Sequence, residues 1–421
     1  MPPLPPTLAR ILDDSRDTLI HLQKILTSIP ALAPQNGGTG EWPKARALCD
    51  ALAALDFPPP VFLSAPDPRV PEGSRPNILF KLAGSPPHTA DPTRWFIAHL
   101  DVVPPGQGWS RDPFILHVDG DRLVGRGTLD NHQGIVSSVL AFHALLRAGL
   151  PHCPVALLLV SDEETGNAHG LQFLLEHHAL FGPHDLLIVP DAGNPQSTMI
   201  EVAEKSLLWL KVETRGLQSH ASYPAGGKNA LLAAAKLIAR LATLYDLFPQ
   251  TDPLFDPPFS TFEPTQKPAN GIDSINTIPG EDVFYLDCRL LPSCDPQQVI
   301  AAINAMAQEI QREMSLATRY APAPLAIDVS VVSQNPPAAA TSPAAPVVRA
   351  IQSAILEIYG VDAVPVGIGG ATAAGLLRRR GFPAAVWATM DEVAHHIDEY
   401  SRISFTLNDA RVFAHLCLYP A

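Results

Sequence analysis

The chain has 421 residues, of which 46% are hydrophobic and 17% charged, and its formal net charge is −13. This composition excludes a wholly disordered chain, and no apolar run approaches the roughly 20 residues that a membrane-spanning helix needs. The negative charge disfavours nucleic acid and anionic membrane surfaces as partners, because binding to either requires a basic face.

The chain opens with MPPLPPTLAR, in which prolines stand on both sides of Leu4 and no apolar stretch follows. This pattern predicts a frayed start and not a signal peptide, so the expected location is cytoplasmic. The five cysteines form an odd, scattered set without a CxxC pair: Cys49, Cys153, Cys288, Cys294 and Cys417. Their spacing argues against a disulfide framework and against a thiolate metal site.

Residues 1–206 alternate amphipathic helices with short apolar strands. Helical spacing appears at 17–26 and 134–150, and buried strands are predicted at RWFIAHL (94–100), VALLLV (155–160) and DLLIVP (185–190). An Asp-Gly turn within HVDGDRLV (117–124) predicts a hairpin. Alternating strands and helices predict an α/β layer with a mainly parallel sheet and flanking helices.

The pattern of predicted strands and helices changes at residues 207–333. A strand, a helix, a strand, a helix and a strand follow in turn, at 207–216, 229–248, 282–292, 296–314 and 325–332. This order predicts a smaller α+β module. A proline- and alanine-rich connector follows this module, and alternating helices and strands are again predicted within residues 334–421. We therefore expect an inserted domain at 207–333, with 1–206 and 334–421 folding together.

Acidic residues and histidines follow several of the predicted strands. They occur in HLDVVPP (His99, Asp101), GRGTLDNHQG (Asp130, His132), SDEETGN (Asp162, Glu163, Glu164), PDAG (Asp191) and AHHIDEY (His395, Asp398). Taken singly each is weak, because a lone histidine or a turn aspartate is ordinarily structural. Ligand sites of open α/β sheets, however, lie outside the carboxyl ends of the strands, so these side chains are expected to converge.

Several carboxylates in one crevice would repel one another unless a cation compensates them. Imidazole and carboxylate ligands without thiolate suit zinc, cobalt or manganese better than calcium. His99 and Asp101 share a face of an extended segment, so we assign His99 as a ligand and Asp101 as the group that orients it. Adjacent Glu163 and Glu164 suit the two roles that a metallohydrolase needs side by side, general base and ligand.

In this order, HLDVVP, GRGTLDN, DEETG, PDAG and HHIDE resemble the di-zinc family of acetylornithine deacetylase, succinyl-diaminopimelate desuccinylase, aminoacylase and glutamate carboxypeptidase. The resemblance covers nearly the whole chain. It implies a zinc-exopeptidase-like catalytic domain, and GLQSHASYPAGGKNA, SINTIPG and DCRLLP resemble the family's inserted lid and dimerisation domain. A homodimer through this lid is therefore expected.

The resemblance also implies the metal ligands and the groups that do the chemistry. Asp130 would bridge two metals, one also bound by Glu164 and His395, and the other by His99 and Asp191. The metals are expected to be zinc, with cobalt or manganese as alternatives. Catalysis is expected to use Glu163 as general base and Asp101 as orienting group, with His220 reaching the partner subunit's active site to stabilise the oxyanion.

Substrate binding would involve the lid and a glycine-rich loop. Asn276 and Arg289 resemble residues that hold the substrate carboxylate, and Gly370 and Ala371 stand in the glycine-rich substrate loop. Both lid residues also have a structural interpretation, since Asn276 suits a turn and Arg289 could end a strand in an ion pair.

Three positions distinguish this chain within the family, and two of them, the substrate loop and Asp191, bear on the substrate. His132 stands where the family commonly has lysine, a position expected to cap or pack. After the double glycine the family commonly has threonine or serine followed by aspartate, whereas this chain has Ala371, Thr372 and Ala373. Asp191 stands where deacetylases usually have glutamate and several di- and tripeptidases have aspartate. Because the loop differs, the substrate of other family members is a weaker guide to the substrate of this chain. Asp191 favours short peptides.

The expected function is metal-dependent hydrolysis of an amide bond in a small N-acyl amino acid or short peptide with a free carboxylate. Attack would come from a metal-bridged water with Glu163 as general base, and a deacylase or desuccinylase is preferred. A di- or tripeptidase or carboxypeptidase of the same family is the alternative, and a catalytically inactive metal-dependent binding protein is a third possibility.

Overall fold

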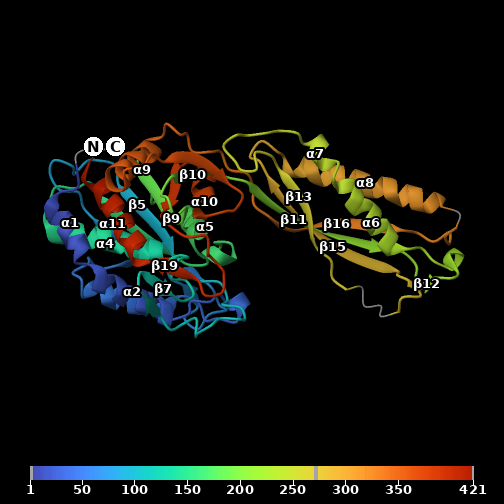
Figure 1. Ribbon diagram of the computed structural model, residues 1–421, viewed down its shortest axis with the longest axis horizontal. Helices are drawn as coiled ribbons and strands as arrows, with labels where there is room; N and C mark the ends of the chain where they lie inside the picture. The colour runs from blue at the N-terminus through green and yellow to red at the C-terminus, as the bar shows by residue number, and fades with distance from the viewer. Residues whose placement is uncertain (1–2, 270–273, 318, 420–421) are drawn as a thin grey trace. The chain divides into compact units, whose positions relative to one another are not determined.

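A computed structural model describes residues 3–269, 274–317 and 319–419, which divide into two compact units (Figure 1). Unit 1 comprises Met1–Val202, Ala340–Val366 and Thr372–Ala421, and unit 2 comprises Ala203–Ala339 and Gly367–Ala371. The assignment of 207–333 as a lid and dimerisation domain, flanked by the catalytic segments 1–206 and 334–421, stays a prediction.

Unit 1 is built on an eight-stranded sheet. In spatial order its strands are β1 (Val61–Phe62), β4 (Ile78–Leu82), β8 (Val155–Val160), β5 (Arg94–His99), β9 (Leu186–Gly193), β18 (Ala384–Ala388), β10 (Met199–Glu204) and β17 (Val364–Ile368). The central pairs β8–β5, β5–β9 and β9–β18 are parallel, whereas β1–β4, β4–β8 and β18–β10 are antiparallel. The predicted α/β class with a mainly parallel sheet is confirmed.

Helices cover both faces of this sheet because its central strands are apolar on both sides. The helices of unit 1 are α1 (Pro6–Asp13), α2 (Arg16–Ser28), α3 (Trp42–Ala53), α4 (His132–Ala148), α5 (Leu171–His177), α9 (Pro346–Tyr359), α10 (Ala373–Arg379) and α11 (Ile403–Leu418). Along β5, Ile97 joins a core with α5 and α10, and its neighbour Phe96 faces Phe413 of α11 on the opposite side. The two termini lie side by side, where Tyr419 contacts Pro3 (Figure 1).

The expected frayed start is wrong from Pro6 onward. Pro6 occupies the first turn of α1, where proline's missing N–H costs nothing, and Leu8 and Leu12 of this helix are buried. Met1 and Pro2 lie outside the described residues. Among the described residues, no helix is both long enough and apolar enough to cross a membrane.

Smaller elements complete unit 1. The predicted hairpin is present as β6 (His117–Asp119) and β7 (Arg122–Val124), and β19 (Tyr400–Arg402) pairs with β7. The remaining short pieces are β2 (Ala65–Pro66), β3 (Ser74–Arg75) and the 3-10 turns η1 (Pro34–Asn36) and η2 (Glu163–Thr165).

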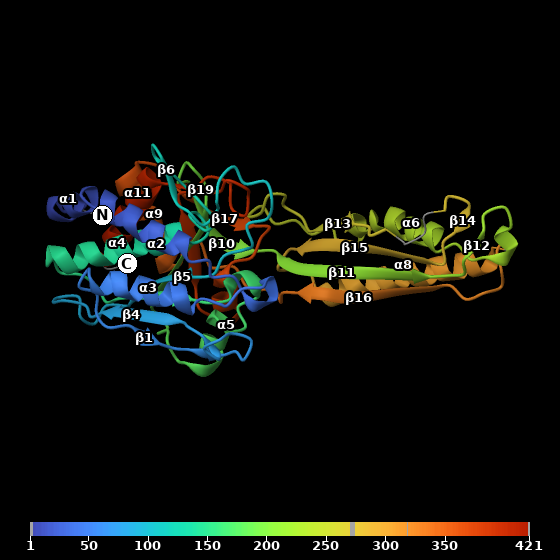
Figure 2. The same ribbon diagram turned by 90° about the horizontal axis from the view of Figure 1, so that it is seen from below.

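Unit 2 is an antiparallel sheet with helices along one face (Figure 2). The strands, in order, are β13 (Thr261–Gln266), β15 (Glu281–Leu290), β11 (Ser206–Arg215) and β16 (Ala326–Gln334), and the helices are α6 (Ala230–Leu241), α7 (Leu244–Leu247) and α8 (Pro296–Leu316). Alternate residues of β11, such as Leu208 and Leu210, pack against the helices. The single helix expected at 229–248 is two helices, α6 and α7. Unit 2 also contains the short strands β12 (Ser219–His220) and β14 (Thr277–Ile278), which pair with each other, and the 3-10 turn η3 (Pro224–Gly226).

Candidate metal centre

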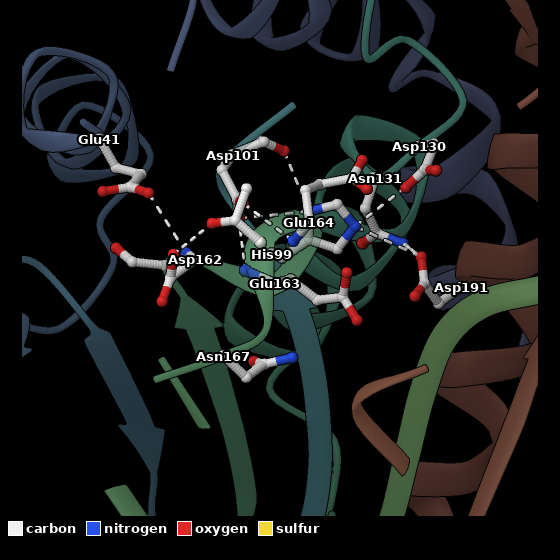
Figure 3. Close-up of polar contacts among 12 residues, drawn as sticks. Glu41, His99, Asp101, Asp130, Asn131, Asp162, Glu163, Glu164, Asn167 and Asp191 are labelled. Carbon is white, nitrogen blue, oxygen red and sulfur yellow. Dashed lines mark hydrogen bonds and ion pairs between the residues drawn. The ribbon is translucent and has the colours of Figure 1, made fainter. Parts of the chain in front are cut away.

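The predicted ligands of unit 1 lie at the carboxyl ends of three neighbouring strands. His99 ends β5, Glu163 and Glu164 follow β8 in η2, and Asp191 stands near the end of β9. Asp130 lies in the turn two residues before α4, and Figure 3 shows its side chain directed toward the same place as those of His99 and Asp191. Strands that are parallel and adjacent therefore bring distant motifs to one edge of the sheet.

Asp130 is shared between two groups of possible ligands. One group is His99, Asp130 and Asp191, and the other is Asp130, Glu164 and His395, with the ligand atoms of each group within 4.8 Å of one another. The Nε2 atom of His99 lies 2.9 Å from Asp130 Oδ1, and that of His395 lies 3.0 Å from Asp130 Oδ2. Each oxygen of Asp130 thus faces a different histidine, as a bridging carboxylate requires.

The remaining ligand distances are similar. His99 Nε2 lies 3.5 Å from Asp191 Oδ1, and His395 Nε2 lies 3.3 Å from Glu164 Oε2. Two imidazoles and three carboxylates, without sulfur, form a donor set that fits two divalent cations such as zinc, cobalt or manganese.

Asp101 orients both His99 and the acidic turn. The Nδ1 atom of His99 donates to the backbone carbonyl of Asp101 at 3.0 Å and lies 3.6 Å from its Oδ1, which leaves the Nε2 lone pair facing Asp130 and Asp191. The carboxylate of Asp101 accepts the backbone N–H groups of Glu163 at 3.1 Å and Glu164 at 3.0 Å. One side chain therefore fixes a candidate ligand and the candidate base together.

The charges in this crevice perturb one another strongly. Burial raises the pKa of Glu163 well above its usual range, and the negative charges of Asp191 and Glu164 raise it further. Burial and Asp130 raise the pKa of Glu164 to about 7, against the hydrogen bond from His395. Hydrogen bonds to Asp130 and Glu164 raise the pKa of His395 to about 10. Without a cation these acids must share protons, and divalent cations would remove that need.

Glu399 fixes the loop that carries Asp130. Its Oε1 accepts the backbone N–H groups of Leu129 at 2.9 Å and Asp130 at 3.1 Å, and its Oε2 forms a buried ion pair with Arg126. Sequence reasoning gave Glu399 no role beyond its place in the late motif. Its function as a backbone acceptor depends on a contact across 269 residues of chain, which no local pattern reveals.

His132 takes part in a second buried contact beneath the site. Its Nε2 lies 2.8 Å from Nζ of Lys44, and both side chains are fully buried. Burial lowers the pKa of Lys44 to about 7, although the carboxylates of Asp101, Glu41 and Glu399 act in the opposite direction. Lys44 was not singled out by its sequence context, because it stands on α3, far from every motif.

The turn after β8 rests on a buried ion-pair network. Asp162 adopts a left-handed backbone conformation with φ 63°, and its backbone N–H donates to Glu41 at 3.2 Å. Its carboxylate accepts the backbone N–H of His169 at 3.0 Å and lies 3.4 Å from the guanidinium of Arg75. Arg75 in turn pairs with Glu41 and, at 3.6 Å, with Asp67. Asp162, to which the sequence pattern assigns no function, therefore anchors the turn that carries Glu163 and Glu164.

Replacing Arg75 by alanine is expected to lower the free energy of unfolding by about 3–5 kcal/mol, because it leaves buried carboxylates uncompensated. Arg75, Glu41 and Asp67 have fully buried side chains. The matched control is Arg46→Ala, since Arg46 pairs with Glu72 at 3.1 Å but is 59% exposed, and its loss is expected to cost at most about 1 kcal/mol. Urea unfolding of the two variants measures the difference, and equal costs would contradict the role of Arg75.

The candidate substrate residues all lie in unit 2. His220 and Asn276 are exposed on the neighbouring strands and turn of β12 and β14, with His220 Nε2 3.5 Å from Asn276 Nδ2. The backbone N–H of Ser222 donates to Nδ1 of His220 at 3.1 Å, which assigns the ring proton to Nε2. The other ring nitrogen, Nε2, is therefore the one that can donate.

Arg289 is joined to the glycine-rich loop within unit 2. Its Nε and Nη2 donate to the carboxylate of Asp287 at 2.8 and 3.0 Å, and its Nη1 donates to the carbonyl of Gly369 at 3.2 Å. Gly370 and Ala371 follow directly in that loop. The ion pair considered from the sequence is present, and it leaves Arg289 next to the loop that was expected to touch substrate.

Comparison with known proteins supports one family. The family model described as peptidase family M20/M25/M40 matches residues 95–419. An uncharacterized metallohydrolase of Methanococcus maripaludis is 34% identical over 94% of this chain and 98% of its own, and a succinyl-diaminopimelate desuccinylase of Sphingopyxis alaskensis is 27% identical over 69% of this chain and 73% of its own.

Solved structures show the same fold. Human carnosine dipeptidase 1 superposes with a TM-score of 0.74 at 16% identity and covers 99% of both chains. The aminopeptidase PepT of Bacillus cereus superposes with a TM-score of 0.73 at 18% identity, covering 96% of this chain and 98% of its own. At such identities the likeness concerns the fold alone.

Proposed function

Since the chain belongs to the peptidase family M20/M25/M40 and is a metallohydrolase of amide or peptide bonds, we propose that it acts on a small N-acyl amino acid or short peptide with a free carboxylate. The observation that carries this proposal is the pair of ligand groups that share Asp130, with the carboxylate of Glu163 beside them. A deacylase or desuccinylase activity is preferred.

Two divalent metal ions, zinc in the first instance, would be held by the two groups. His99 and Asp191 would bind one ion, Glu164 and His395 the other, and Asp130 both. When bound, such ions supply Lewis acidity, which acidifies water and polarises a carbonyl oxygen. Asp101 keeps His99 in the tautomer whose Nε2 lone pair is free to bind.

Glu163 is proposed as the general base. Among the described residues, none donates a hydrogen bond to its carboxylate or forms an ion pair with it, whereas its backbone N–H is held by Asp101 (Figure 3). A fixed backbone and a free carboxylate suit a group that must accept a proton and release it again. Glu163 would take the proton of the attacking water and deliver it to the leaving nitrogen.

Unit 2 would supply the groups that recognise the substrate. His220, with its proton on Nε2, would donate to the developing oxyanion of the partner subunit's site within a homodimer. Asn276 and Arg289 would hold the substrate carboxylate. Because Asp287 already neutralises Arg289, the substrate carboxylate would have to share this guanidinium, and Gly370 and Ala371 would lie beside it in the loop.

Sequence similarity favours an N-acyl amino acid as the substrate, whereas one residue of the site favours a short peptide. The relative from Sphingopyxis alaskensis is named as a desuccinylase, which favours an N-acyl amino acid. Asp191, which resembles the aspartate of several di- and tripeptidases, favours short peptides. The expected cytoplasmic location would expose the enzyme to both substrate classes.

A hydrolysis screen distinguishes these activities. The purified chain, loaded with zinc, cobalt or manganese, would be assayed with N-acetyl and N-succinyl amino acids and with dipeptides, before and after chelation. We expect the highest kcat/KM with an N-acyl amino acid, and loss of all activity after chelation. Activity confined to dipeptides would transfer the assignment to a peptidase, and inactivity with two metals bound would indicate a binding protein.

A further inference from the structure

A third group of possible metal ligands lies near the amino-terminal ends of two central strands of unit 1. His88 and Asp91 stand in the loop that leads into β5, and Cys153 stands two residues before β8. Both strands end at the candidate metal centre, so this group lies at their amino-terminal ends. A six-residue strand spans about 20 Å, so this group is distinct from the two groups that share Asp130.

The three side chains converge on one another. His88 Nδ1 lies 2.9 Å from Asp91 Oδ2, and Cys153 Sγ lies 3.5 Å from the same oxygen. All three ligand atoms lie within 4.8 Å of one another. Zinc bond lengths of about 2.0–2.3 Å place tetrahedral ligand atoms about 3.3–3.8 Å apart, which small side-chain rotations would reach here.

We propose that His88, Asp91 and Cys153 bind one zinc ion, in addition to the ions held around Asp130. A thiolate, an imidazole and a carboxylate together favour zinc over calcium, magnesium or manganese, which prefer oxygen ligands. A water molecule or an external ligand would complete the tetrahedron.

The backbone holds the two ligand-bearing segments together. The N–H of Ser85 donates to the carbonyl of His152 at 2.9 Å, and the N–H of His152 donates to the hydroxyl of Ser85 at 2.9 Å. His88 N–H donates to the carbonyl of Ser85 at 2.7 Å, and Cys153 N–H donates to that of Cys417 at 2.7 Å. The ligands are therefore positioned by hydrogen bonds that do not involve their own side chains, as a preorganised site requires.

The charges leave Asp91 available to a cation. Among the described residues, no lysine or arginine forms an ion pair with Asp91, and its polar side-chain partners are His88 and Cys153. The nearby guanidinium of Arg94 donates instead to the backbone carbonyls of Pro92, Leu416 and Tyr419. Arg94 is thus fixed by backbone carbonyls and does not pair with the carboxylate of Asp91.

Zinc binding at this site would release one proton, that of the Cys153 thiol. The Cys153 thiol would release its proton to solvent, and neutral His88 would keep its ring proton on Nε2 while Nδ1 binds the metal. Burial raises the pKa of the Cys153 thiol to about 11, with Arg94 acting in the opposite direction, so the thiol stays protonated until a metal displaces the proton. His88 and Asp91 are 20% and 27% exposed, which provides the path of entry.

The role of such an ion would be structural. It would tie the loop before β5 to the start of β8, two neighbouring central strands whose other ends carry His99 and the acidic turn. Metal binding to the folded state alone stabilises that state by mass action, so zinc is expected to raise Tm further than the ions around Asp130 do by themselves.

Cobalt substitution tests the proposal, because this site has a sulfur ligand and the two groups that share Asp130 have none. We expect the wild-type chain to bind three equivalents of cobalt and to develop a thiolate-to-cobalt charge-transfer band in the near ultraviolet. Cys153→Ala is expected to lose the band and one equivalent, with two equivalents and hydrolytic activity unchanged.

Two further variants make the result decisive. Cys417→Ala removes a buried cysteine whose backbone carbonyl contacts Cys153 but whose side chain is not in the group, so the band should persist. His88→Ala changes a partly exposed loop residue and should abolish the band even if Cys153→Ala does not fold. Equal cobalt binding by the wild type and Cys153→Ala, or a band that survives His88→Ala, would overturn the proposal.

Discussion

Replacement of Glu163 by glutamine is expected to lower kcat by about 10²–10⁴-fold, which is the usual contribution of general acid–base catalysis. Glutamine keeps the size and shape of the side chain but cannot accept the proton of the attacking water. The backbone N–H of residue 163 would still donate to Asp101, so the turn and the neighbouring ligand should stay in place. The metal content and Tm of the variant should therefore match those of the wild type.

Glu164→Gln provides the matched control for this prediction, because the same chemical change is made one residue further along. Glu164 belongs to the ligand group with Asp130 and His395, so this variant is expected to lose metal as well as activity. Metal analysis after dialysis, combined with steady-state kinetics, separates the two roles. If Glu163→Gln retained turnover, or lost metal as Glu164→Gln does, Glu163 would not be the general base.

The central strands of unit 1 could be predicted because each is a short apolar run between turn signals. In β5, β8 and β9 both faces are buried under helices, so nearly every residue is apolar. Their order in the sheet was not predictable from such patterns. β18 lies between β9 and β10, although about 180 residues separate it from either, and pairings of this kind depend on tertiary packing.

The expected single helix at 229–248 was wrong for a local reason. The apolar spacing continues through the whole segment, but α6 ends at Leu241 and a separate turn, α7, begins at Leu244. Thr243 donates its hydroxyl to the carbonyl of Arg240 at 2.8 Å, a side-chain bond that competes with continued helix. Periodicity predicts the buried face, whereas helix ends depend on such individual contacts.

The candidate ligands could be proposed from the sequence because their motifs stand directly at strand ends. Their supporting residues could not. Asp162 depends on Glu41 and Arg75, which stand 121 and 87 residues away, and neither belongs to a motif. No cysteine lies near Cys153 in the sequence, so its spacing argues against a metal site, yet Asp91, 62 residues earlier, is its neighbour in the fold. Local spacing finds ligands that share a motif and overlooks those that only the fold brings together.

Asp130→Asn is expected to abolish activity and to weaken both metal sites together, because each oxygen of Asp130 faces a different histidine. Asparagine keeps the side-chain shape but has one carbonyl oxygen and no negative charge, so it cannot bridge two cations. The fall in kcat should equal or exceed the about 10²–10⁴-fold loss expected without the general base.

Asp191→Asn makes the same isosteric change in a ligand that belongs to only one group. It is therefore expected to lose one equivalent of metal, while Asp130→Asn loses two, as measured by metal analysis after dialysis against a weak chelator. Glu399 should hold the loop in both variants, since it accepts backbone N–H groups and not the altered side chains. If both variants lost the same amount of metal, Asp130 would not bridge two ions. A bridging carboxylate contributes to both ions, whereas Asp191 contributes to one.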